Sequence, residues 1–188
     1  MIRVLLSGGI DSAAVLGWAV ERDTVTCIAY RYGQRHEREI ESAERIARLF
    51  DVGLIVRELR FEDRGALMAG SEQDPITGSV VIPGRNELFL RLAATTGPEP
   101  DSVAFGATLE DQRDFEDCRP DFVARMSAEL GMPVHAPFIG RRKMDVIRFA
   151  RAAGGDLLLR HTWSCYMGNA PACGKCPACV NRLKGFYL

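Results

Sequence analysis

The segment Ser7-Gly8-Gly9-Ile10-Asp11-Ser12 constrains the fold of this chain more than any other part of its sequence. It follows an apolar run at residues 2–6, which predicts a buried strand, and it leads into residues 11–20, which predict a helix. Glycines let the backbone turn tightly and bring its N–H groups against an anion, and the start of the helix adds a partial positive charge. We therefore predict a phosphate-binding loop formed by Leu6, Ser7, Gly8, Gly9, Ile10, Asp11 and Ser12.

This loop differs from the two commonest nucleotide-binding patterns. It is not a Gly-x-Gly-x-x-Gly fingerprint, and no lysine follows the glycines as in a Walker loop. An aspartate inside a phosphate loop would repel the ligand, so Asp11 implies either a Mg²⁺ ion between the two charges or a capping role at the helix. A purely structural turn is the alternative, and the match of all six residues in this context argues against it.

Strands and helices alternate along most of the remaining chain. We expect strands at residues 24–30, 53–58, 101–106 and 134–138, and helices at residues 36–50, 86–94, 120–130 and 143–153. This order predicts an α/β fold with a parallel sheet and helices on both faces. Because ligands bind at the carboxyl ends of such strands, the loops after Leu6, Tyr30 and Gly106 should share one crevice. Residues 65–78 form the most loop-like stretch and are expected to be mobile.

Four of the six cysteines lie close together near the end of the sequence, namely Cys165, Cys173, Cys176 and Cys179. Four thiolates with two Cys-x-x-Cys spacings suit a tetrahedral Zn²⁺ ion, and a closed set of four indicates a structural site. An iron–sulfur cluster is the alternative. The change of composition in this region predicts two units, an ATP-binding domain at residues 1–160 and a metal-binding module at residues 161–188. Cys27 and Cys118 are expected to pack as small apolar side chains.

Charge and hydropathy exclude several classes of protein. The 24 basic and 25 acidic residues give a net charge of −1, so the chain cannot bind nucleic acid or a membrane through bulk charge. No apolar run approaches the roughly 18 residues of a membrane-spanning helix, and Asp11 interrupts any signal peptide. We therefore expect a cytoplasmic protein, in which clustered cysteines indicate a metal rather than disulfides.

The Ser-Gly-Gly-x-Asp-Ser motif resembles the signature of the PP-loop ATP pyrophosphatase superfamily, whose members activate a carboxylate or carbonyl by adenylation. Within that superfamily the chain resembles the 7-cyano-7-deazaguanine (preQ0) synthase family. Further stretches carry this likeness in order along the chain: Tyr32-Gly33-Gln34-Arg35-His36, Pro83-Gly84-Arg85-Asn86, Asp117-Cys118-Arg119-Pro120, and Thr162-Trp163-Ser164-Cys165-Tyr166 with the closing cysteines.

The resemblance implies an ATP-dependent ligase of queuosine and 7-deazaguanine biosynthesis. Such an enzyme converts 7-carboxy-7-deazaguanine and ammonia to 7-cyano-7-deazaguanine through an adenylated carboxylate and then an adenylated amide. The implied cofactors are ATP, Mg²⁺ and Zn²⁺, and the implied assembly is a homodimer. Neither a membrane nor a nucleic acid is expected as a partner.

The resemblance also assigns candidate site residues. The catalytic candidates are Asp11, Arg85 and Lys143, and the ATP-binding candidates are the phosphate loop together with Tyr30, Tyr32, Gln34 and Arg35. The candidates for substrate binding are Arg85, Asn86, Glu110, Asp111, Asp114 and Asp117. Turn packing is the alternative for Tyr32 and Gln34, and a solvated acidic loop is the alternative for the three aspartates. His36, His135 and His161 are scattered, and we interpret them as structural.

Some stretches depart from the family pattern. The chain is short around residues 61–79, and Val80-Val81-Ile82 and Asp114-Phe115-Glu116 differ in detail. A paralogue that acts on a related deazapurine carboxylate is therefore one alternative. A PP-loop enzyme of the tRNA thiolation type is a second, which the near-zero net charge disfavours. A zinc-ribbon interaction module with a vestigial nucleotide fold is a third, and the intact Ser7–Ser12 motif argues against it.

Overall fold

The computed structural model describes residues 1–60 and 65–187. Within these residues, five parallel strands form one sheet in the order β3-β2-β1-β4-β5. The strands are β1 (Ile2–Leu5), β2 (Val25–Arg31), β3 (Gly53–Glu58), β4 (Ser102–Ala104) and β5 (Val134–His135). β1 is paired with β2 on one side and β4 on the other, so the loops that follow these three strands emerge at the same edge of the sheet.

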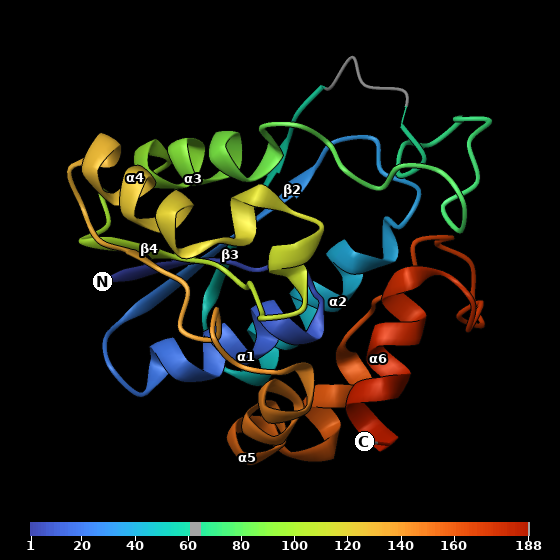
Figure 1. The fold of residues 1–188 in the computed structure, drawn as a ribbon. Helices are drawn as coiled ribbons and strands as arrows, with labels where there is room; N and C mark the ends of the chain where they lie inside the picture. The colour runs from blue at the N-terminus through green and yellow to red at the C-terminus, as the bar shows by residue number, and fades with distance from the viewer. Residues whose placement is uncertain (61–64, 188) are drawn as a thin grey trace.

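Helices cover both faces of the sheet, which confirms the predicted α/β class (Figure 1). One face is covered by α1 (Ile10–Val20), α2 (Arg38–Leu49) and α5 (Lys143–His161), and the other by α3 (Arg85–Thr95) and α4 (Pro120–Leu130). The last helix, α6 (Pro177–Tyr187), packs against α5. Two short 3-10 helices, η1 (Asp111–Arg113) and η2 (Glu116–Cys118), lie between β4 and α4. Among the described residues, no helix is long and apolar enough to cross a membrane.

Side chains along each strand alternate between two separate cores. Val4 and Cys27 belong to the core under α1, α2 and α5, whereas Ile28 and Val103 belong to the core under α3 and α4. A strand that is buried on both faces therefore has apolar residues in succession, which is the pattern that predicted β1. Cys27 is fully buried in this way, as a small apolar side chain.

The element boundaries differ from the expected ones mainly in the second half of the chain. β4 and β5 are shorter than predicted, because the chain leaves the sheet at Phe105 and Ala136. α5 continues to His161 through a non-helical residue, Gly155. α6 was not predicted, because its sequence is dominated by cysteine, glycine and polar residues rather than by an apolar stripe.

The stretch at residues 65–78 is a loop, as predicted, but its first part is anchored. Ala66, Leu67 and Met68 are buried against the α3 side of the sheet. The Arg35 N–H donates to the Leu67 carbonyl oxygen at 2.8 Å, and the Ala69 N–H donates to the Gly33 carbonyl oxygen at 2.7 Å. Residues 61–64, which belong to the shortened stretch 61–79, lie outside the described residues.

Arg3 is a fully buried cation in the central strand. Its guanidinium donates to the carbonyl oxygens of Ala93 (3.2 Å), Thr96 and Pro98 (2.8 Å), and to the Thr26 hydroxyl (3.0 Å). These carbonyls lie at the end of α3, where the last C=O groups of a helix have no partner within the helix. Burial lowers the pKa of Arg3. Arg3 therefore fixes the end of α3, and so the position of the helix that carries Arg85.

We expect Arg3→Met to destabilise the protein by about 3 kcal/mol, because it leaves buried carbonyl groups at the end of α3 without donors. The free energy of unfolding from urea denaturation measures this effect. Arg45→Met is the matched control, since Arg45 is 49% exposed and forms an exposed i,i+4 ion pair with Glu41. Equal stability of the two variants would contradict the role given to Arg3.

Candidate active site

A cavity of about 260 Å³ lies at the carboxyl ends of β1, β2 and β4. The predicted convergence of loops is confirmed, because Leu6, Tyr32 and Gly106 all line this cavity. The starts of α2, α3 and α5 contribute further walls. Side chains that are distant in the sequence therefore meet in one place.

The phosphate loop is shaped by its close contact with α2. Gly8 has a φ of +90°, and a Cβ atom at this position would lie 2.2 Å from the Glu39 carbonyl oxygen, so glycine is required. The Ser12 hydroxyl donates to the Gly9 carbonyl oxygen at 3.1 Å, and the hydroxyl oxygens of Ser7 and Ser12 lie 3.1 Å apart. No side chain of the described residues caps α1. The N-terminal N–H groups of α1 are therefore available to an anion.

Lys143 explains how an aspartate is accommodated in this loop. The Lys143 ammonium donates to both carboxylate oxygens of Asp11, at 2.7 and 2.5 Å. Burial acts to lower the pKa of Lys143, but the carboxylates of Asp11 and Asp111 outweigh it and raise that pKa. Asp11 does not cap α1, whose N-cap is Gly9. The capping interpretation of Asp11 is therefore wrong.

The donor set at this end of the cavity fits a Mg²⁺ ion. The carboxylates of Asp11 and Asp111 both line the cavity. Burial and then the charge of Asp11 raise the pKa of Asp111, which shows that the two carboxylates are close enough to repel each other. Carboxylate oxygens are the protein ligands that Mg²⁺ prefers, usually together with phosphate oxygens of the substrate.

The structure brings most of the predicted site residues to this one cavity. Those that line it are Leu6, Ser7, Gly9, Ile10, Asp11, Ser12, Tyr30, Tyr32, Gln34, Arg85, Asn86, Asp111 and Lys143. Gly8 lies behind the loop, against α2. The side chain of Gln34 is engaged in the turn itself, since it accepts from the Tyr32 N–H (2.7 Å) and donates to the Tyr30 carbonyl oxygen (3.2 Å). This geometry favours the turn-packing interpretation of Gln34.

Besides Gly8, four predicted residues lie outside the cavity lining. Arg35 donates to the backbone carbonyls of Met68, Ser71 and Gln73, and so fastens the loop after residue 65. The Glu110 carboxylate accepts from the Lys143 N–H at 3.1 Å, at the start of α5. Asp114 is exposed and pairs with the neighbouring Arg113 at 2.9 Å. Asp117 is half-buried beside Cys118, and burial raises its pKa.

His36 and Glu39 also line the cavity, although the sequence analysis interpreted His36 as structural and did not single out Glu39. Both lie at the start of α2, and His36 Nε2 is 3.4 Å from Glu39 Oε2. Burial, and then the nearby charge of Arg85, lower the pKa of His36 to about 3, so that its imidazole is neutral. Glu39 immediately precedes Ile40, and Ile40 and Ala43 belong to the buried side of an amphipathic helix. An acidic residue beside that apolar stripe is the signal that could have found it.

The segment before the cysteine cluster docks directly on the phosphate loop. The Trp163 N–H donates to the Gly8 carbonyl oxygen at 2.9 Å. Arg182 of α6 donates to the Thr162 hydroxyl at 2.7 Å and to the Leu159 carbonyl oxygen at 3.0 Å. Trp163, Tyr166 and Arg182 all line the cavity. The tail therefore forms one wall of the site.

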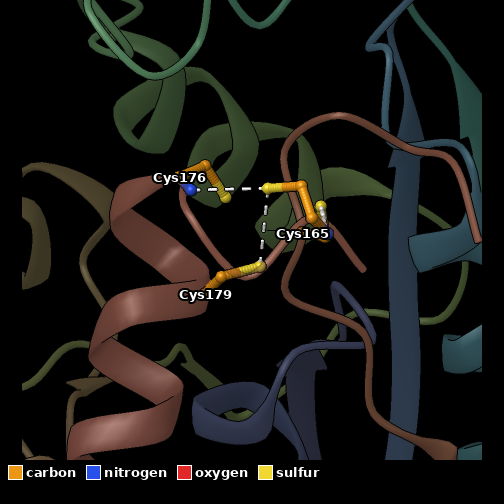
Figure 2. Close-up of side chains that lie close together, drawn as sticks. Cys165, Cys176 and Cys179 are labelled. Carbon is orange, nitrogen blue, oxygen red and sulfur yellow. Dashed lines mark hydrogen bonds between the residues drawn. The ribbon is translucent and has the colours of Figure 1, made fainter. Parts of the chain in front are cut away.

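The four predicted metal ligands meet at the start of α6. Figure 2 shows Cys165, Cys176 and Cys179 with their side chains directed toward one another. The sulfur atoms of these three residues and of Cys173 all lie within 4.8 Å of one another. Four sulfurs around one ion, each at about 2.3 Å, would be separated by about 3.8 Å. This spacing fits a single tetrahedral ion.

Backbone N–H groups around the cysteines stabilise the negatively charged thiolates that a metal site requires. The N–H groups of Lys175 and Cys176 donate to Cys173 Sγ at 3.5 and 3.4 Å, and the Cys173 N–H donates to Cys165 Sγ at 3.3 Å. Burial opposes ionisation of Cys173, but the two backbone donors, together with hydrogen bonds from the thiols of Cys165 and Cys176, outweigh it and lower the pKa of the Cys173 thiol to about 6. A thiolate is the form that binds a metal.

The strand order, the Ser-Gly-Gly-x-Asp-Ser loop and its cavity define a PP-loop nucleotide-binding fold. Two solved structures share this fold at low sequence identity. A predicted subunit of a tRNA methyltransferase from Methanocaldococcus jannaschii has a TM-score of 0.54 at 14% identity, over 79% of this chain and 73% of that one. The U34-tRNA thiolase NcsA from Methanococcus maripaludis, solved with its [4Fe-4S] cluster, has a TM-score of 0.52 at 15% identity, over 98% of this chain and 63% of that one.

Sequence comparison narrows the class to one family. The family described as "Queuosine biosynthesis protein QueC" matches residues 2–188, and the chain belongs to this family. Its relatives include the 7-cyano-7-deazaguanine synthase of Thermoplasma acidophilum, which is 34% identical over 97% of this chain and 86% of that protein. The 7-cyano-7-deazaguanine synthase of Prochlorococcus marinus is 31% identical over 96% of this chain and 91% of that protein. The resemblance inferred from the motifs is thereby confirmed.

We expect Cys176→Ser to lose the bound metal and to lower the melting temperature, because Cys176 belongs to both Cys-x-x-Cys pairs. The C-terminal segment that contains the cysteines buries few apolar side chains of its own. A bound metal would therefore supply much of the free energy with which this segment folds. Elemental analysis and thermal unfolding measure the two effects. Cys27→Ala is the control, since Cys27 is buried under the sheet and far from the cluster in the fold. A native protein that is folded and free of metal would contradict this assignment.

Proposed function

We propose that this chain is an ATP-dependent ligase that converts 7-carboxy-7-deazaguanine and ammonia to 7-cyano-7-deazaguanine. One observation carries the proposal: a single cavity joins the phosphate loop and the Asp11–Lys143 pair to a second end with buried charged and aromatic side chains. Such a cavity suits a nucleotide and a polar, flat second substrate. Membership of the QueC family, and relatives that are named 7-cyano-7-deazaguanine synthase, support the same reaction.

The first half of the reaction activates the carboxylate. Oxide is too poor a leaving group for ammonia to displace directly. One carboxylate oxygen therefore attacks the α-phosphate of ATP, which breaks the bond to the β-phosphate and releases pyrophosphate. Ammonia then attacks the carbonyl carbon of the acyl adenylate, AMP leaves with the oxygen that it acquired, and the nitrogen loses a proton to give the amide.

The second half removes the remaining oxygen. The amide oxygen attacks the α-phosphate of a second ATP molecule, and pyrophosphate leaves again. Loss of both protons from nitrogen and of AMP from carbon then forms the nitrile. Two ATP molecules are consumed, and both carboxylate oxygens leave on AMP.

The residues of the cavity are suited to positioning and charge stabilisation in both halves. The backbone of Ser7–Ser12 and the N-terminus of α1 bind the pyrophosphate group. Lys143 neutralises negative charge that develops on the phosphates. A Mg²⁺ ion, held through Asp11 and Asp111, would supply further compensation of the phosphate charge.

For the cysteine cluster we propose a structural Zn²⁺ ion rather than an iron–sulfur cluster. Cysteines that bind four different irons must hold their sulfurs farther apart than cysteines that share one ion. Sulfur atoms within 4.8 Å of one another favour the single ion. A closed set of four thiolates leaves no open position for chemistry.

The proposal extends to location and assembly. Four free thiols arranged for a metal suit a reducing compartment, so we place the enzyme in the cytoplasm. We propose a homodimer, as the resemblance implies, and sedimentation equilibrium measures it directly.

The purified protein, incubated with 7-carboxy-7-deazaguanine, ATP and ammonium, tests the proposed reaction. We expect a product with the mass of the nitrile and two AMP molecules for each nitrile formed. A product that stops at the amide, or ATP consumption only with a different deazapurine carboxylate, would support the paralogue and contradict our proposal. Modification of tRNA without nitrile formation would support the thiolation-type alternative.

We expect Asp11→Asn to lower the rate of AMP formation by at least about 100-fold, because it removes both the partner of Lys143 and a ligand suited to Mg²⁺. The fold should persist, since the pair lies at the cavity and not in either core. Asp145→Asn is the control, because Asp145 lies in the same region of α5 and its carboxylate pairs with Arg148, at 3.7 Å, rather than with a cavity residue. AMP formation at the parental rate would remove Asp11 from the mechanism.

A further inference from the structure

One end of the cavity contains a buried cation, Arg85, that has no hydrogen-bonded carboxylate among the described residues. The Arg85 guanidinium lines the cavity at the start of α3 and donates to the Tyr32 hydroxyl at 3.3 Å. Its Nε atom is buried and has no hydrogen-bond partner among the described residues. No carboxylate in the described part of the chain forms an ion pair with it. A cation that is removed from water in this way requires an acceptor, and the cavity is where a ligand can supply one.

An acidic side chain with few partners lies in the same end of the cavity. Only 17% of the Glu39 side chain is exposed, and within the described residues its carboxylate contacts only His36, at 3.4 Å. Burial raises the pKa of Glu39 to about 8, and Arg85 opposes this shift. Nδ1 of His36 is also buried without a partner among the described residues. Glu39 therefore carries unused acceptor capacity for a ligand with N–H donors.

Aromatic rings surround Glu39 and Arg85 in the cavity. The centroids of Tyr32 and Phe89 are 5.6 Å apart, and those of His36 and Tyr166 are 5.7 Å apart. Tyr32, His36, Phe89 and Tyr166 all line the cavity. Aromatic walls favour a flat, aromatic ligand over an aliphatic one.

We infer that Glu39 and Arg85 recognise the 2-amino-pyrimidinone ring of the substrate. The Glu39 carboxylate accepts hydrogen bonds from the ring N1–H and the 2-amino group, and the Arg85 guanidinium donates to the ring carbonyl oxygen. This inference rests on the proposed function, because that function supplies a ring with two adjacent donors beside one acceptor. It makes Glu39 and Arg85 specificity-determining residues and gives Arg85 no role toward phosphate.

Each of the other acidic candidates either has one or more acceptors engaged or, like Asp117, does not line the cavity. Asp111 accepts from the backbone N–H and the hydroxyl of Thr108, at 2.9 and 2.7 Å, and also faces Asp11 and Lys143. The Glu110 carboxylate binds the start of α5, and Asp114 is exposed. Glu39 is also close to the phosphate loop, because its carbonyl oxygen lies against Gly8. Glu39 and the phosphate loop therefore line the same cavity.

Binding measurements without ATP test the inference independently of turnover. Isothermal titration calorimetry of the full chain compares 7-carboxy-7-deazaguanine with its counterpart that lacks the 2-amino group. We expect the unmodified protein to bind the 2-amino compound at least about 10-fold more tightly, because the counterpart leaves one acceptor of Glu39 unpaired. Equal affinity for the two compounds would overturn the inference without any variant.

Glu39→Gln tests the residue itself. We expect this variant to bind the 2-amino compound about 10- to 100-fold more weakly and to lose most of the preference over the counterpart, because an amide offers one acceptor and places a donor against the ring N–H groups. A variant that keeps the parental preference would overturn the assignment. Glu41→Gln is the matched control on α2 and should change nothing, since Glu41 is 57% exposed and pairs with Arg45.

The two proposals fail in different ways. The protein could prefer the 2-amino compound through Glu39 and yet form no nitrile. That result would contradict the proposed reaction but support the recognition site. Conversely, the protein could form the nitrile while its preference for the 2-amino compound does not depend on Glu39. That result would support the reaction but contradict the inference.

Discussion

The contact between the phosphate loop and α2 is the constraint on which the rest of the site depends. At Gly8 the loop lies so close to the Glu39 carbonyl oxygen that no side chain fits. This approach turns the loop toward the cavity and places the start of α2, with His36 and Glu39, beside it. The loop that we propose binds phosphate and the helix start that we propose binds the ring are thereby held together by one backbone contact.

Two distant parts of the chain complete this arrangement. Lys143, at the start of α5, neutralises Asp11 in the loop, and the N–H of Trp163 donates to the carbonyl oxygen of Gly8 from the other side. The segment that contains Trp163 leads directly into the cysteine cluster, and Arg182 of α6 binds back to it. A metal bound by the cluster would therefore stabilise the wall of the active site as well as the tail.

The parts of this structure that could be predicted are those encoded by neighbouring residues. The phosphate loop, the parallel sheet and the cysteine cluster each follow from short patterns of glycine, apolar residues or cysteine. Asp11 and Lys143 are 132 positions apart, so no local sequence pattern predicts that they form an ion pair. Arg35 lies in a motif shared with the family, yet its side chain binds the backbone of the following loop. Glu39 was missed because charged residues in amphipathic helices are interpreted by default as solvated.

The central claim is that the protein adenylates a carboxylate in this cavity. Transfer of oxygen from the substrate to AMP tests this claim most directly. The measurement uses 7-carboxy-7-deazaguanine labelled with ¹⁸O in both carboxylate oxygens, with ATP and ammonium in ordinary water, and determines the mass of the AMP released. The account predicts that each AMP carries one labelled oxygen, because the acyl and imidoyl oxygens both leave on the α-phosphate. Unlabelled AMP would show that water attacks ATP instead, and would contradict the account.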